Sequence, residues 1–214
     1  MTDDFLQEFN QSLLTGFVDK DANSEVLFQP KLLVNSKNPK KKVLTSILKE
    51  FNNCESFKIS VAFVTTGGVA TIINTLQALE EKNIQGEVLV SQYLNFTQPE
   101  ALERLLQFKN IDLRIATKNS SHSKGYIFKT SKYYNLIIGS SNLNQSALAS
   151  NKEWNLQVSA LKTSDIADKV ISEFNKDFEV STKVTHEYIL AYRDIYSKQR
   201  LLSKSVIPIQ SELN

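Results

Sequence analysis

Two side chains that can attack and neutralise a phosphate lie two residues apart near the middle of this 214-residue sequence, His122 and Lys124. In a strand, residues i and i+2 share a face, so the imidazole and the ammonium are expected to project together while Ser123 points away. Histidine can attack phosphorus to give a phosphohistidine, and a nearby lysine neutralises charge on the non-bridging oxygens. A second histidine would then protonate the leaving oxygen. The pair indicates phosphodiester chemistry, with nucleic acid as the expected substrate.

Two short segments downstream carry polar groups that suit the same chemistry. Ser140 and Asn142 offer a hydroxyl and an amide to phosphate oxygens, and Gly139 would let a phosphate approach the backbone closely. Glu153 can accept a hydrogen bond from an imidazole N–H, which fixes the tautomer and supports a developing positive charge. The alternative is that Gly139 to Asn142 form an ordinary turn and that His122 is a structural histidine.

Metal chemistry has little support in the sequence. It contains two histidines, His122 and His186, and no Cys/His cluster with zinc spacing. Hydrolysis is therefore expected to need neither a metal nor another cofactor. His186 stands at the start of an expected helix and is interpreted as a capping or surface residue, with a role as the second catalytic histidine as the alternative. The single cysteine, Cys54, excludes an intrachain disulfide.

Composition is that of an ordinary globular protein, with 41% hydrophobic residues and a net charge of +2. The N-terminus is acidic at Asp3 and Asp4, and no apolar run is long enough to cross a bilayer, so a cytoplasmic location without a membrane partner is expected. A basic run surrounds Pro39. It is interpreted as a solvated loop that leads into a helix, and the alternative is a phosphate-contacting patch. The run consists of Lys37, Lys40, Lys41 and Lys42.

The elements that must position these residues follow from hydrophobic periodicity. Strands and helices alternate through the first half, which favours right-handed crossovers and a sheet covered on both faces. Three strands without a full helix between them come next, so the expected fold is an α/β/α sandwich with a mixed central sheet. Helices are expected near residues 4–17, 43–51, 69–79, 99–108, 166–178 and 188–196, and strands near 31–34, 57–64, 87–91, 111–117, 124–129, 134–138 and 154–161.

The motif residues resemble the pattern of the phospholipase D superfamily, which is His-x-Lys-x4-Asp followed by Gly-Ser-x-x-Asn or a close variant. His122, Lys124 and the segment from Gly139 to Asn142 match it. The position of the family's aspartate falls on Lys129, so that acidic role is not carried over. Restriction-endonuclease members of the superfamily use a later acidic residue, which makes Glu153 the candidate substitute.

A closer resemblance, over residues 60–64, 93–102, 122–128, 138–143 and 151–155, is to the N-terminal phospholipase D-like domain of bacterial DEAD/DEAH-box helicases. It implies a phospholipase D-like domain over residues 1–203 and a linker over 204–214 that leads to a helicase core absent from this chain. The chain contains no Gly-x-x-x-x-Gly-Lys-Ser/Thr motif, so it is not expected to hydrolyse ATP by itself.

The resemblance also implies the function. Superfamily members with one motif per chain form homodimers whose motifs meet across a two-fold axis. The expectation is a metal-independent phosphodiesterase, a DNA nuclease that uses a phosphohistidine at a homodimer interface. The main alternative is a catalytically silent nucleic-acid-binding or dimerisation module of a helicase, which Lys129 favours. Lipid cleavage is less favoured because no amphipathic membrane helix rich in basic and aromatic residues is found.

Overall fold

The computed structural model describes residues 3–22, 24, 27–92, 95–117 and 121–205. Its helices are α1 (Asp3–Phe17), α2 (Val43–Asn53), α3 (Thr66–Glu81), α4 (Pro99–Leu106), α5 (Gln145–Ala149), α6 (Asp165–Glu179) and α7 (His186–Ser205). The strands of its main sheet are β1 (Lys31–Leu33), β4 (Ser56–Val61), β5 (Gln85–Ser91), β6 (Ile111–Ala116), β7 (Gly125–Lys129), β8 (Tyr133–Gly139), β9 (Asn155–Leu161) and β10 (Thr182–Lys183). A separate hairpin joins β2 (Ser36–Lys37) to β3 (Lys40–Lys41).

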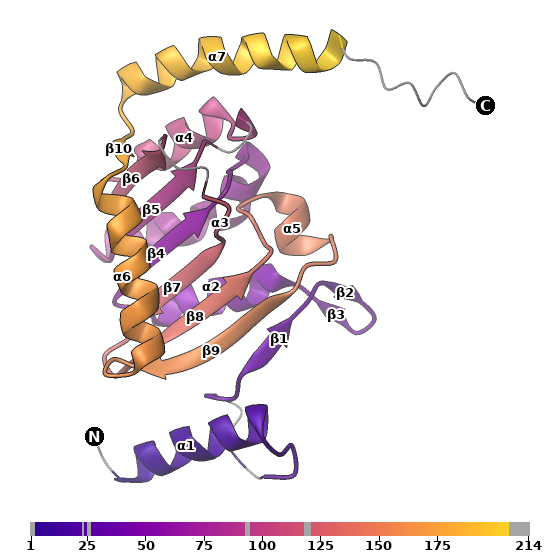
Figure 1. The fold of residues 1–214 in the computed structure, drawn as a ribbon, viewed down its shortest axis with the longest axis vertical. Helices are drawn as coiled ribbons and strands as arrows, with labels where there is room; N and C mark the ends of the chain where they lie inside the picture. Colours follow the sequence, from indigo (N-terminus) through magenta and orange to yellow (C-terminus); the bar gives the residue numbers. More distant parts are fainter. Residues whose placement is uncertain (1–2, 23, 25–26, 93–94, 118–120, 206–214) are drawn as a thin grey trace, which may run out of the picture.

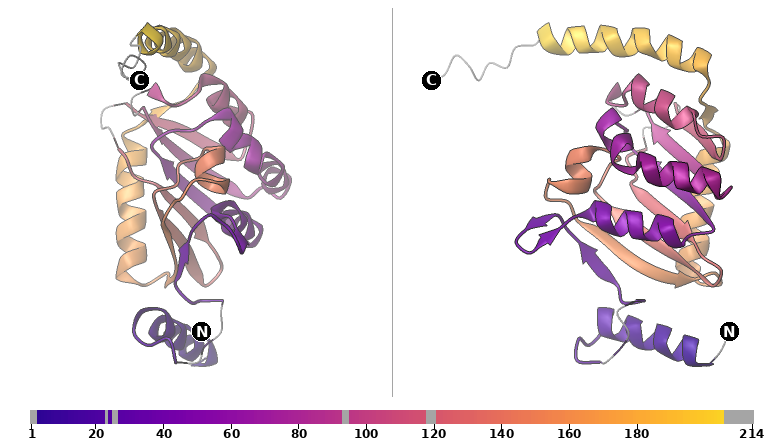
Figure 2. Two further views of the ribbon diagram at one scale, coloured as in Figure 1. Left: turned by 90° about the vertical axis from the view of Figure 1, so that its right-hand side faces the viewer. Right: turned by 180° about the vertical axis from the view of Figure 1, so that it is seen from behind.

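The main sheet is mixed and lies between two helical layers. Its strand order is β1-β9-β8-β7-β4-β5-β6-β10, with β4, β5 and β6 parallel and the other pairs antiparallel. Helix α6 covers one face, and α2, α3, α4 and α5 cover the other (Figures 1 and 2). The α/β/α sandwich expected from the sequence is confirmed.

The larger core lies between the sheet and the layer of α2, α3 and α4. Phe51 of α2 meets Phe57 and Phe128 edge to face, with ring centroids 5.0 Å apart in both pairs. All three rings are buried, and such geometry adds to the stabilisation from burial. A smaller core lies under α6, where Phe174 and Phe178 pack on the opposite face of the sheet. Strands β5, β7 and β8 contain consecutive buried residues and are therefore covered on both faces, whereas β4 alternates between buried and half-buried residues.

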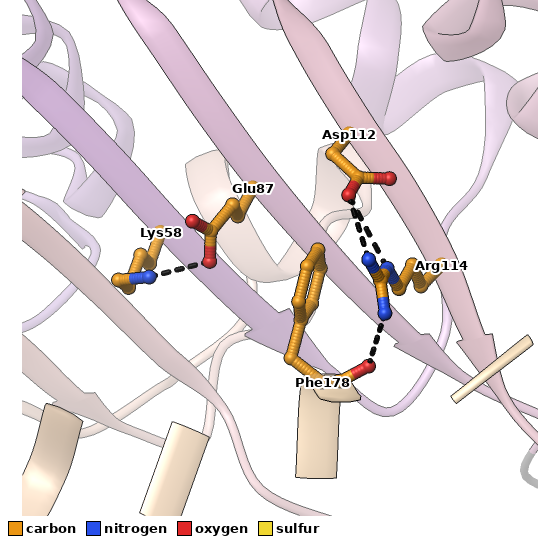
Figure 3. Close-up of polar contacts among 5 residues, drawn as sticks. All are labelled: Lys58, Glu87, Asp112, Arg114 and Phe178. Carbon is orange, nitrogen blue, oxygen red and sulfur yellow. Dashed lines mark hydrogen bonds and ion pairs between the residues drawn. The ribbon is translucent and has the colours of Figure 1, made fainter. Parts of the chain in front are cut away.

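Polar side chains on the α6 face fix the C-terminal end of that helix (Figure 3). Arg114 Nη2 lies 3.0 Å from Asp112 Oδ2, while its Nη1 donates to Phe178 O at 3.1 Å. The Arg114 guanidinium also lies 4.3 Å from the centroid of the Phe178 ring. On the neighbouring strands, Lys58 forms an ion pair with Glu87. The Arg114 contacts hold the end of α6 against β6, and Lys58 Nζ, 4.9 Å from the centroid of the Phe174 ring, joins α6 to β4.

Some boundaries differ from the sequence expectations. The basic run is not a loop, because Ser36–Lys37 and Lys40–Lys41 pair as an antiparallel hairpin. The short helix α5 and strand β10 were not expected. Helix α7 extends through Ser205, and residues 206–214 of the expected linker lie outside the described residues, as do residues 93 and 94 of one motif block. The domain boundary at residue 203 stays a prediction.

Candidate active site

Strand register brings the expected site residues to one end of the sheet. Ser60 is opposite Gly125, Gly125 is opposite Ile138, and Gly139 is opposite Asn155. Strand β7 therefore begins where β8 ends and β9 begins. The segments that flank these strand ends, residues 121–124, 139–142 and 151–154, meet beside α5 (Figure 1).

His122 and Lys124 contact each other directly at this end. Lys124 Nζ lies 2.7 Å from His122 Nδ1 and donates to His122 O at 2.6 Å. The expected pairing is present, but the expected strand geometry is wrong, because β7 begins only at Gly125. His122 and Lys124 lie in the loop before the strand, and their side chains make contact there rather than on a strand face. Because an ammonium can only donate, Nδ1 is the acceptor, and this contact assigns the proton of neutral His122 to Nε2.

Lys124 is buried whereas His122 is exposed. Burial lowers the pKa of Lys124, and the negative charge of Glu153 acts in the opposite direction and raises it. Tyr126 lies in the interior behind them and donates to Ser141 O at 3.1 Å. Burial raises the pKa of Tyr126, and Glu153 raises it further. Glu153 therefore acts electrostatically on both groups.

Glu153 is held at the site by Ser140. The Ser140 hydroxyl donates to Glu153 Oε2, and it accepts from Trp154 N at 3.1 Å. Ser140 N donates to Trp154 O at 3.0 Å. A phosphate contact was expected for the Ser140 hydroxyl, whose proton is donated to the Glu153 carboxylate in this structure. Ser140 thus positions the acidic residue of the site.

Asn142 and Gly139 have structural tasks that the sequence did not reveal. Asn142 Oδ1 accepts from the backbone N–H groups of Ala62 at 3.0 Å and Phe63 at 3.3 Å, so only its Nδ2 is left to donate to a phosphate. At Gly139, an added Cβ would lie 2.2 Å from the carbonyl oxygen of Trp154. The close approach that requires glycine in this structure is therefore that of Trp154 and Asn155, and the expected approach of a phosphate to Gly139 stays a prediction.

Other polar residues at this end had been given no role. Asn155 is 1% exposed; its Nδ2 donates to Ser141 Oγ at 2.8 Å and its Oδ1 accepts from Ser141 N at 3.2 Å. A chain of hydroxyls supports the loop before β7, because Ser123 Oγ lies 2.8 Å from Ser60 Oγ and 2.9 Å from Ser121 Oγ. The sequence signal for Ser60, Ser123, Ser141 and Asn155 was only their place in the motif blocks, and Ser121 lies just outside one of these blocks.

A cavity of about 420 Å³ opens beside the His122–Lys124 pair, between the sheet and α6. Apolar side chains line its inner part, and charged side chains of α6 stand at its rim. The apolar residues are Ile127, Ile138, Val170 and Phe174, and the charged ones are Lys169, Glu173 and Asp177. The space is adequate for one flanking group of a phosphodiester.

The other histidine lies away from this site. His186 is the exposed first residue of α7, which follows β10, and in the sheet β4, β5 and β6 separate β10 from β7. The cap of α7 is Thr185, whose Oγ1 accepts from Tyr188 N at 3.2 Å. Of the two histidines, His122 lies at the site and His186 does not.

Over the part of the chain that the structure describes, no group of three or more His, Cys, Asp or Glu side chains is arranged to hold a metal ion. Over the same residues, no helix is long and apolar enough to cross a bilayer.

The part of the chain that contains this site matches the model of a known family. A family model described as "Cardiolipin synthase, PLD-like domain" matches residues 47–178, from within α2 to the end of α6. The match therefore includes the site at the ends of β7, β8 and β9. A search of the curated proteins found no match.

Solved structures share the fold at low sequence identity. Nuc from Salmonella typhimurium, described as a phospholipase D family member, has a TM-score of 0.56 and 15% identity over 73% of this chain and 99% of that one. NucT from Helicobacter pylori has a TM-score of 0.57 and 19% identity over the same shares. Phosphatidylserine synthase from Haemophilus influenzae Rd KW20 has a TM-score of 0.55 and 16% identity over 82% of this chain and 44% of that one.

Proposed function

This chain belongs to the phospholipase D superfamily through its PLD-like domain, and on that premise we propose that it is a metal-independent phosphodiesterase that cleaves nucleic acid, with DNA as the expected substrate. The observation that carries the proposal is the contact of Lys124 Nζ with His122 Nδ1, 2.7 Å, at the mouth of a cavity. It places a nucleophile and a fixed positive charge where one phosphate can meet both. We further propose that the chain is the N-terminal domain of a helicase-type protein, as its motif blocks imply.

The contact also indicates how the nucleophile becomes available. While Lys124 donates to Nδ1, the ring proton is on Nε2 and that nitrogen cannot attack. An arriving phosphate draws the ammonium to its non-bridging oxygens, so Nδ1 can take the proton and Nε2 presents its lone pair. Attack forms an Nε2–P bond as the leaving P–O bond breaks and its oxygen takes a proton from a general acid. Water then attacks phosphorus, the P–N bond breaks, and the former acid accepts the water proton.

The general acid has to come from elsewhere, because His186 lies beyond β10 and one chain supplies one histidine to the site. We propose that His122 of a second copy acts as this acid across a two-fold axis. Glu153, which Ser140 holds in place, stabilises the positive charge that develops on an imidazole of the site during proton transfer.

The position of Lys129 weakens the case for a catalytically silent module. Lys129 ends β7 and its carbonyl oxygen accepts from Glu55 N at 2.7 Å. Lys124 immediately precedes the other end of this strand, so the two residues are about 16 Å apart at the usual rise of an extended chain. An aspartate at position 129 would be too far from the His122–Lys124 pair of the same chain to contact it. Its absence therefore takes no group away from that pair.

A substrate panel in EDTA tests the proposed function. We expect cleavage of single- or double-stranded DNA and of a small bis-aryl phosphodiester, because no step needs a metal. RNA and a phosphatidyl lipid belong in the same panel. Cleavage of the lipid alone would replace the nuclease by a lipid-cleaving enzyme. Binding of DNA with steep salt dependence but no cleavage of any substrate would favour the silent module.

Lys124 is expected to set the alkaline limb of the pH profile. Its ammonium must be charged to neutralise the phosphate, and burial lowers its pKa, so activity should fall as pH rises through that lowered value. Because Glu153 raises the pKa of Lys124, Glu153→Gln should shift the alkaline limb to lower pH and reduce the rate. The measurement is kcat/KM for the small diester against pH. Glu173→Gln, at the rim of the same cavity, is the matched control and should leave the limb in place. An unmoved limb in Glu153→Gln would contradict the electrostatic role.

A further inference from the structure

The β2–β3 hairpin places a dense group of positive charges at the site end of the molecule. It projects beside α5 in both views that show it clearly (Figures 1 and 2). Lys37, Lys40 and Lys41 are exposed, and Lys42 is half-buried where the hairpin leads into α2. Within the described residues, none of these four ammonium groups takes part in an ion pair. The charge is therefore available to an external anion.

Asn35 anchors the hairpin to the segment that carries Glu153. Its Nδ2 donates to the carbonyl oxygens of Ala147 and Asn151, both at 2.7 Å, and its Oδ1 accepts from Val43 N at 2.9 Å. One side chain thus joins the hairpin, the end of α5, the start of α2 and the loop before β9. Asn151 is two residues before Glu153, a separation of at most about 7 Å along the chain. The hairpin is therefore held at a fixed place near the site.

A polar groove continues from the hairpin toward the site segments. It has a volume of about 730 Å³ and runs between the starts of α2 and α3 and the short helix α5. Lys42, at the end of the hairpin, and Asn144, two residues after Asn142, both line it. Hydroxyl and amide groups line most of the rest. They belong to Thr65, Thr66, Gln98, Gln145, Ser146 and Ser150.

We propose that the β2–β3 hairpin binds the phosphate backbone of a nucleic acid beyond the scissile phosphate, and thereby directs the strand along the groove to His122. The proposal rests on the proposed function and deepens it by assigning a substrate-binding surface. A nucleic-acid strand offers a phosphate at every step, so several lysines of one short hairpin can each meet an anion. These contacts fix position and carry no base specificity.

Two features favour nucleic acid over an anionic membrane as the occupant. The hairpin, with Asn38-Pro39 at its tip, holds no aromatic, leucine, isoleucine, valine or methionine side chain that would insert between lipids. The neighbouring groove is lined by polar groups rather than apolar ones. The hairpin also lies outside residues 47–178, the part of the chain that the family model matches.

The experiment compares the salt dependence of DNA binding in two charge-matched variants, each made in a His122→Ala background so that the substrate stays intact. The first replaces the four hairpin lysines by glutamine: K37Q, K40Q, K41Q and K42Q. The control replaces four exposed lysines away from the site: K82Q, K109Q, K132Q and K183Q. Each lysine that binds a phosphate contributes about 0.7 to 0.9 to the slope of log K against log salt concentration. We expect the hairpin variant to lose about 2 to 3 units of slope and the control to lose less than about 1.

The same substitutions in catalytically intact protein separate this proposal from the proposed function. Hairpin substitution should lower cleavage of long DNA at least about tenfold at moderate salt and leave hydrolysis of the small diester unchanged. An equal slope in the hairpin and control variants overturns the hairpin proposal, whether or not the small diester is cleaved. A reduced slope in a protein that cleaves nothing supports the hairpin surface and overturns the nuclease. Loss of binding to anionic vesicles, with DNA binding unchanged, would overturn the proposal in favour of a membrane surface.

Discussion

Replacing His122 by alanine is expected to reduce phosphodiester cleavage in EDTA by on the order of 10³-fold or more, because the variant has neither the nucleophile nor the general acid of the proposed mechanism. His186→Ala is the matched control: it removes the other imidazole from the exposed start of α7 and should retain wild-type rates. The measurement is single-turnover cleavage of labelled DNA, with the small diester in parallel. Undiminished cleavage by His122→Ala would exclude the mechanism.

Mixed dimers show whether two copies of His122 share one site. Wild-type and His122→Ala chains are unfolded together, refolded at different ratios and assayed. If each site needs both histidines, activity follows the square of the wild-type fraction, so an equal mixture keeps about one quarter of the activity. Independent sites give about one half. Linear dependence, or a fully active monomer in sedimentation, would contradict the two-fold arrangement.

The elements of the fold were predictable because each has a local cause. The 3.6-residue spacing in α2 and the alternation of apolar and polar residues in β4 are properties of single segments, and the order of strands and helices limits how those segments connect. The hairpin β2–β3 was not predictable in the same way. Its strands, Ser36–Lys37 and Lys40–Lys41, contain no apolar alternation, and Asn35 fixes them through contacts with residues more than a hundred positions away.

The sequence predicted which residues gather at the site better than it predicted the role of each residue. The spacing of His122 and Lys124 indicated a pair, and the structure joins them. The roles of Ser140, Asn142 and Gly139 depend instead on which backbone lies against them. Sequence spacing does not show that Asn142 contacts the backbone at the end of β4, about 80 residues earlier. Nor does it show that the start of β9 lies against Gly139. Tertiary contacts of this kind give the expected phosphate ligands a second task, which is to support the residues beside them.

Two adjacent glycines at the start of α3 should respond in opposite ways to the same substitution. A Cβ on Gly68 would lie 1.9 Å from the carbonyl oxygen and 2.4 Å from the carbonyl carbon of Leu143. Backbone atoms cannot rotate away, so Gly68→Ala is expected to lower the free energy of unfolding by about 3 kcal/mol. At Gly67 the nearest atom is Gln145 Oε1 at 3.3 Å, the end of a flexible side chain. Gly67→Ala should be neutral or stabilise by up to about 1 kcal/mol, because alanine favours the helix. Urea unfolding measures both.

Gly68→Ala should also impair catalysis in molecules that remain folded. Thr65 N donates to Leu143 O at 3.1 Å, so the start of α3 is bound to the same carbonyl that the new methyl group would displace. Leu143 follows Asn142, whose Oδ1 holds the backbone after β4, and a shift at Leu143 is passed to the segment that begins at Gly139. We therefore expect kcat for the small diester to fall in Gly68→Ala below its unfolding temperature and to stay at the wild-type value in Gly67→Ala. Equal kcat values for the two variants would show that the turn at Leu143 does not position the site.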